Sequence, residues 1–105
     1  MPPETTPILN EVRSEIQPEK LKQEGFTVLP QRVSLIEGIN SDKEHVYYVY
    51  LVYPNRTSEA DLAWKKIEPI VSWVRKHVWD RTGQTTWPYV KVKREQELPP
   101  ELVSA

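Results

Sequence analysis

The side chains best suited to chemistry in this chain are its two histidines, because the sequence contains no cysteine. Without cysteine, a tetrahedral zinc site needs several histidines or carboxylates brought together. His45 opens a predicted strand and His77 lies on the flank of a predicted helix, and neither stands at a metal-binding spacing. The missing cysteine also removes thiolate catalysis and disulfides. We therefore expect no metal site.

Acidic side chains could act as general acids or bases, and the best-placed pair is Asp61 with Glu68, two turns apart on one helix. Lys65 follows Asp61 by four residues, which is the spacing of a surface ion pair. The glycines stand singly and far apart, so no phosphate-binding loop is present; they are Gly25, Gly38 and Gly83. We expect no catalytic residues, no cofactor and no enzymatic activity. An enzyme that pairs His77 with an outer-helix carboxylate is the weakest hypothesis.

The net charge of −1 hides a basic segment that holds all four tryptophans. Residues 61–94 carry eight basic and three acidic side chains, a net charge of +5. The preceding and following segments are acidic, each with a net charge of −3. The overall charge therefore says little about partners, and the basic segment is the part to test.

Residues 85–95 alternate between two faces, as a strand does. Val90 and Val92 lie on one face, and the other carries Trp87, Tyr89, Lys91 and Lys93. Aromatic rings interleaved with lysine suit single-stranded nucleic acid, because bases stack on the rings and ammonium groups meet phosphates. Candidate nucleic-acid contacts are therefore Lys91, Lys93 and Arg94. The same pattern equally suits a sheet face packed against a protein.

Residues 45–53, with the sequence HVYYVYLVY, give the clearest strand signal. Both faces of this strand are apolar or aromatic, which predicts a central strand covered on both sides. The chain offers one long helix, over residues 58–80, to cover one of those faces. An aromatic sheet face is then left without cover, and such a surface normally marks a partner site. The candidate partner-binding residues are Tyr48, Tyr50, Trp73, Trp87 and Tyr89.

The long helix has one apolar stripe, which we expect to face the sheet. Its members are Ala60, Ala63, Trp64, Ile67, Ile70, Val71, Val74 and Val78. Trp73 and Trp79 fall on opposite flanks of this stripe. Each is either tucked under a neighbouring segment or exposed as an aromatic anchor.

The order of elements predicts an α+β fold in two layers: a short N-terminal helix, a β-hairpin, one long helix and a third strand (α-β-β-α-β). The first strand is expected within residues 26–39, where Pro30 interrupts the pattern. Proline near both ends predicts disordered tails over residues 1–7 and 96–105, which leaves a single domain over residues 8–95.

The compartment is expected to be the cytoplasm, because the first residues lack the pattern of a secretory signal. The longest apolar run, residues 46–53, is far below the roughly 20 residues that span a bilayer, so no membrane association is expected.

Two hypotheses for function follow. The first is a small interaction or assembly module that self-associates as a homo-oligomer through the aromatic sheet face. The alternative is a nucleic-acid-binding domain that uses residues 61–94.

Overall fold

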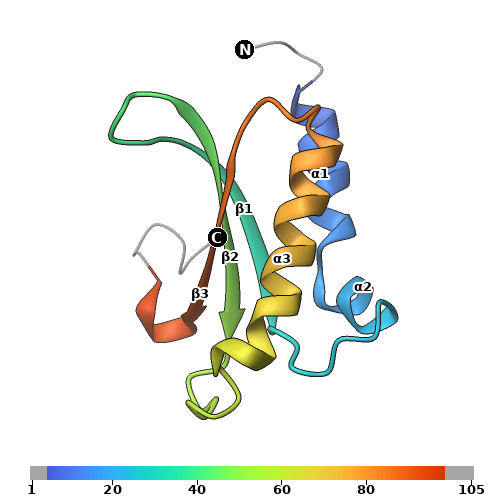
Figure 1. The fold of residues 1–105 in the computed structure, drawn as a ribbon, viewed down its shortest axis with the longest axis vertical. Helices are drawn as coiled ribbons and strands as arrows, with labels where there is room; N and C mark the ends of the chain where they lie inside the picture. Colours follow the sequence, from blue (N-terminus) through green and yellow to red (C-terminus); the bar gives the residue numbers. More distant parts are fainter. Residues whose placement is uncertain (1–4, 99–105) are drawn as a thin grey trace.

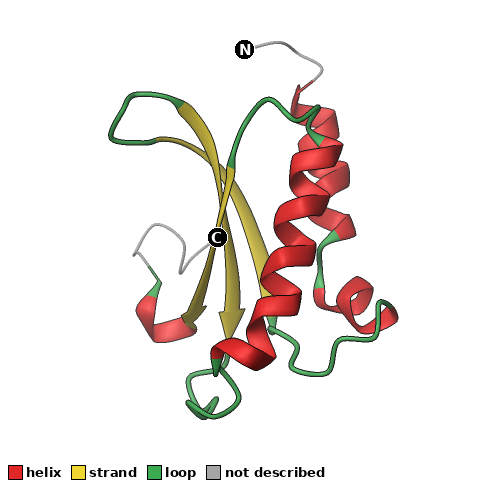
Figure 2. Cartoon of the chain, in the orientation of Figure 1, coloured by secondary structure: helices red, strands yellow, loops and turns green. Residues whose placement is uncertain are grey.

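The computed structural model describes residues 5–98 and confirms the α+β arrangement (Figures 1 and 2). The elements are α1 (Thr5–Glu15), α2 (Pro18–Gln23), β1 (Arg32–Ile39), β2 (His45–Tyr53), α3 (Trp64–Arg81), β3 (Pro88–Arg94) and the short 3-10 helix η1 (Glu95–Glu97). The helices α1 and α3 lie side by side along one face of the sheet. No helix within residues 5–98 is long and apolar enough to cross a membrane.

The three strands form one sheet in the order β1-β2-β3, so the two-sided strand β2 is central, as predicted. β1 and β2 pair antiparallel as a hairpin, and β3 pairs parallel to β2 after the crossover through α3. β1 begins at Arg32, two residues after Pro30. Proline has no N–H for the ladder, so residues 26–31 form a loop whose apolar side chains pack onto the core.

The core lies between the sheet and the helices. β2 contributes alternate side chains to it, Tyr47, Val49, Leu51 and Tyr53, all buried. α3 contributes the central part of the predicted stripe, namely Ile67, Ile70, Val71, Val74 and Val78. α1 adds Leu9 and Val12, and Ile16 follows directly after its last residue. This packing explains why the short α1 is stable: Leu9 and Val12 are buried against larger elements.

The start of the predicted stripe is wrong. α3 begins at Trp64 rather than residue 58, and the side chains of Ala60, Ala63 and Trp64 are exposed, that of Trp64 by 63%. The preceding residues form turns instead, in which Ser58 Oγ accepts a hydrogen bond from the Asp61 N–H. Ser58 therefore caps a turn and not the helix, and Trp64, the first residue of α3, lies beyond the core.

Both ends of the expected domain are extended by regular structure. α1 already includes residues 5–7, and residues 95–97 form η1. Leu98, just after η1, is only 7% exposed and packs on the sheet face opposite the helices. The remaining parts of the two expected tails, residues 1–4 and 99–105, lie outside the described residues.

Candidate interaction surface

The face of the sheet opposite the helices is covered unevenly. β2 presents alternate side chains there, and its C-terminal half is buried: Tyr50 is 8% exposed, and Val52 is fully buried. Leu98 packs against both of them. Tyr50, a predicted partner contact, is therefore covered by the chain's own C-terminal segment. Toward the N-terminal end of β2, Val46 is also buried and Tyr48 is half-buried, so the exposed rings at this end of the sheet are those of Trp87 and Tyr89, which belong to the chain around β3.

The register between the parallel strands β2 and β3 determines which aromatic residues of the sheet are neighbours. Tyr48 of β2 stands opposite Tyr89 of β3. Their rings stack, with centroids 5.8 Å apart and planes 27° apart. The sequence placed both on one face but could not give the strand order, and the order β1-β2-β3 brings them together.

Gly38 fixes the position of the Tyr48 ring. A Cβ atom on Gly38 would lie 2.5 Å from Cε2 of Tyr48, well inside van der Waals contact. The ring therefore lies directly over the glycine of the neighbouring strand. The ammonium group of Lys91 lies 5.4 Å from the Tyr48 ring centroid, within the range of a cation–π contact. With these contacts Tyr48 is half-buried and acts as a support, while Tyr89 is the more exposed ring.

Trp87 extends this aromatic surface around β3 onto α3. Its ring meets that of Trp79 edge to face, with centroids 5.7 Å apart. The guanidinium carbon of Arg75 lies 5.9 Å from the Trp87 ring centroid. Arg75 and Trp79 are four residues apart and so share one flank of α3. We call the set Tyr48, Trp79, Trp87 and Tyr89, with Arg75 and Lys91, the aromatic patch.

The aromatic patch is both exposed and slightly hollowed. Trp87 is 47% exposed and Tyr89 is 39% exposed. A hollow of about 180 Å³ lies between these residues, Trp79 and the β1–β2 hairpin. Arg75 makes no ion pair within the described residues, and its buried Nε has no hydrogen-bond partner there. The alternation of residues 85–95 predicted that Trp87 and Tyr89 belong to a binding surface. The sequence signal for Arg75 is its spacing of four residues from Trp79, which places both on one flank of a helix.

Trp73, the remaining predicted contact, lies away from the aromatic patch on the opposite flank of α3. Its ring meets Phe26 edge to face at 6.2 Å and stacks on His77 at 4.9 Å. The loop before β1 therefore shields Trp73, which is half-buried at the margin of the core.

The predicted basic contacts divide between two roles. Lys91 and Lys93 share the sheet face of Tyr48, because their β2 partners are Tyr50 and Val52. Arg94 instead stabilises a loop: its Nε donates to the carbonyl oxygen of Thr57.

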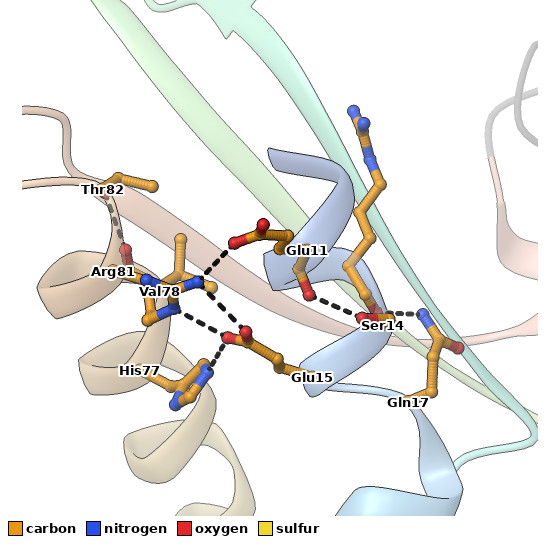
Figure 3. Close-up of polar contacts among 9 residues, drawn as sticks. Glu11, Ser14, Glu15, Gln17, His77, Val78, Arg81 and Thr82 are labelled. Atoms are coloured by element: carbon orange, nitrogen blue, oxygen red, sulfur yellow. Dashed lines mark hydrogen bonds and ion pairs between the residues drawn. The ribbon is translucent and has the colours of Figure 1, made fainter. Parts of the chain in front are cut away.

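A cluster of polar side chains, separate from the aromatic patch, joins α1 to α3 (Figure 3). His77 Nε2 lies 2.7 Å from Glu15 Oε1, and Arg81 contacts both oxygens of Glu15 and one of Glu11. The hydrogen bond from Arg81, followed by that from His77, lowers the pKa of Glu15, against the opposing effect of desolvation.

The geometry of this cluster is that of a clamp between two helices. The Glu15 carboxylate accepts from two cationic or polar side chains of α3, which leaves it little capacity to take a substrate proton. His77 pairs with this α1 carboxylate and not with one on its own helix. Within residues 8–98, no group of three or more His, Cys, Asp or Glu side chains is arranged to hold a metal ion.

No protein-family model, curated protein or solved structure matches this chain. Its function therefore has to be argued from the chemistry of its surface.

Proposed function

We propose that the protein is a small, non-enzymatic interaction module whose aromatic patch binds a protein partner, with a second copy of the chain as the first partner to test. The observation that carries this proposal is the clustering of Trp87 and Tyr89, both well exposed, on a support of Trp79, Arg75 and Tyr48. Tryptophan, tyrosine and arginine are the residue types that dominate binding energy at protein interfaces.

The arrangement of the aromatic patch suits this role because its rings are already held in place. Tyr48 is fixed over Gly38 and stacks with Tyr89, while Trp87 is held between Trp79 and Arg75. A surface whose side chains are ordered before binding loses less conformational entropy when a partner docks. The hollow beside Trp87 offers a place for an inserted partner side chain.

Self-association is tested by the mass in solution, from sedimentation or light scattering at tens of micromolar. We expect a species larger than one chain, and we expect Tyr89→Ser to weaken its assembly at least tenfold. The matched control is Trp64→Ser, because Trp64 is the more exposed ring and stands at the other end of α3, about 22 Å along the helix from Trp79. A strictly monomeric wild type would remove the homo-oligomer version.

Single-stranded nucleic acid is the second candidate ligand, favoured by the position of Lys91 over Tyr48 and of Lys93 further along the same face. An exposed tyrosine beside lysines that form no ion pair within residues 5–98 is able to stack a base and contact its phosphate. If this function holds, affinity falls steeply with salt, and Lys91→Gln reduces that salt dependence. Absence of binding to single- and double-stranded DNA and RNA at low salt would reject it.

A further inference from the structure

The two edge strands of the sheet, β1 and β3, differ in whether their outward backbone groups have hydrogen-bond partners. At the β1 edge, side chains from α1 and from the turn between α1 and α2 contact the backbone groups that point away from β2. Arg13 Nε donates to the carbonyl oxygen of Leu35 at 2.9 Å, and Gln17 Nε2 donates to that of Val33 at 2.9 Å. The N–H of Val33 in turn donates to Gln17 Oε1. Arg13 of α1 and Gln17, just before α2, thus close this edge against a further strand.

The β3 edge has no such cover within the described residues. Tyr47 donates its N–H to the carbonyl oxygen of Trp87, which fixes the alternation of the parallel ladder. The backbone groups of Tyr89, Lys91 and Lys93 therefore point toward β2, and those of Val90 and Val92 point away. In residues 5–98 no hydrogen bond to these outward groups is found.

The side chains of β3 give this free edge a positive charge. Lys91 and Lys93 form no ion pair with any acidic residue in the described part of the chain. The nearest acidic residues along the chain are already engaged: Glu95 pairs with Arg32, and Glu97 accepts from the backbone N–H of Arg94. Within residues 5–98, the edge thus combines backbone groups without hydrogen-bond partners and lysines without ion-pair partners.

We propose that the free edge of β3 binds an extended, acidic peptide segment of a partner protein as a fourth strand. This inference rests on the proposed function as an interaction module and adds the chemical class of the partner. Because side chains alternate along a strand, acidic residues two apart face Lys91 and Lys93. The residue between them is apolar and lies on the helix side, beside the half-buried Val90 and Val92. Main-chain hydrogen bonds supply affinity, and the lysines select acidic sequences.

A second copy of β3 is a poor occupant of this edge. The antiparallel register that uses the outward groups of both Val90 and Val92 places Lys91 opposite the same lysine of the other copy. Like charges directly opposite each other destabilise a strand pair. Self-association is therefore expected at the aromatic patch and not at the β3 edge. An acidic strand complements the charge of the β3 edge better than a second copy of β3 does.

The test is a titration of the ¹⁵N-labelled full chain with a synthetic peptide of alternating Glu and Val residues. We expect the largest amide shifts along β3 and at least tenfold weaker binding of the matched peptide with Lys in place of Glu. Two further peptides carry backbone N-methyl groups on either of the two alternating sets of residues. Only one set directs its N–H groups at β3, so one methylated peptide loses binding and the other keeps it.

The protein-side variants test the same edge. Val92→Pro removes one outward N–H, and proline is tolerated on an edge strand because that N–H faces solvent. Val92→Ala keeps the N–H and removes most of the side chain. We expect Val92→Pro to weaken peptide binding at least tenfold and Val92→Ala less than threefold. Should Val92→Pro fail to fold by circular dichroism, the methylated peptides with the wild-type chain decide the question.

The proposal is overturned if the peptide causes no shifts at millimolar concentration, or if both methylated peptides bind equally. It is also overturned if an oligonucleotide, and not the acidic peptide, shifts the β3 amides. The mass distribution without peptide is measured in the same samples. Assembly that is sensitive to Tyr89→Ser then supports the aromatic patch whether or not the peptide binds.

Discussion

At the scale of single residues, Gly38 decides the geometry of the aromatic patch. The Tyr48 ring occupies the space that a Cβ atom on Gly38 would need. We predict that Gly38→Ala forces the Tyr48 ring to move and lowers the free energy of unfolding by about 1–3 kcal/mol, the usual cost of overpacking. Chemical denaturation measures this loss.

A double-mutant cycle provides the control for that prediction. In a Tyr48→Ala background the ring is absent, so Gly38→Ala should become neutral or slightly stabilising, since glycine is unfavourable inside a strand. An equal loss in both backgrounds would show that the ring is not the cause. In the Gly38→Ala single variant, displacement of the Tyr48 ring should also expose Tyr89 further and change the self-association of the chain.

Tyr53 provides a second prediction at this scale. Burial raises its pKa to about 12, and its hydroxyl donates to the carbonyl oxygen of Val28 at 2.8 Å. A phenol whose pKa is raised on folding adds stability below its unfolded pKa of about 10, and that stability is lost as the pH rises toward 12. We therefore expect the wild-type free energy of unfolding to fall between pH 10 and pH 12, and Tyr53→Phe to show a smaller fall. The phenylalanine variant is less stable at neutral pH by about 1 kcal/mol, because the hydrogen bond is lost.

At the scale of elements, the clamp between α1 and α3 makes stability depend on acid. The pKa of Glu15 is lowered by its hydrogen bonds to Arg81 and His77. A carboxylate with a lowered pKa stabilises the fold above its unfolded pKa of about 4.5, and that stability is lost as the pH falls through the folded value. We expect Glu15→Gln to reduce the loss of unfolding free energy below pH 5. Denaturation at several pH values checks this, with Glu19→Gln on the exposed side of α2 as the control. An unchanged pH profile in Glu15→Gln would contradict the clamp.

Local sequence patterns predicted two features of the helices and strands correctly. The alternation over residues 45–53 correctly predicted a central strand, and the spacing of Ile67, Ile70, Val71, Val74 and Val78 correctly predicted the buried side of α3. Both are local patterns, in which each side chain's face follows from its position along the element.

What the patterns missed depends on contacts between distant segments. The pairing of Tyr48 with Tyr89 follows from strand order and register, which no local spacing contains. Trp64 fits the helical stripe but stands at the first residue of α3, outside the packed region, so an apolar residue at the right angle is still exposed. Leu98 lies between a charged segment and the prolines Pro99 and Pro100, yet it packs against Tyr50 and Val52.

At the scale of the whole molecule, the two faces of the sheet are covered to different extents. Three helices cover the side of Tyr47 and Val49, while on the opposite side Leu98 packs with Tyr50 and Val52 at the C-terminal half of β2. The exposed remainder is the aromatic patch, and the free β3 edge adjoins it. The two proposed binding surfaces thus lie side by side, so one partner would be able to contact the patch and extend the sheet.

This division leads to a prediction about Leu98. Leu98→Ala removes most of a side chain that packs with Tyr50 and Val52, so it should lower the free energy of unfolding by about 2–3 kcal/mol, as truncation of a buried leucine does. The same change enlarges the apolar surface continuous with the aromatic patch. We therefore expect self-association to strengthen while stability falls, measured by light scattering and chemical denaturation on the same samples. Ile8→Ala serves as the control, because Ile8 is a partly exposed residue of α1 on the other side of the sheet. A destabilised Leu98→Ala chain with unchanged self-association would confine the interface to the half of the sheet face around Tyr89.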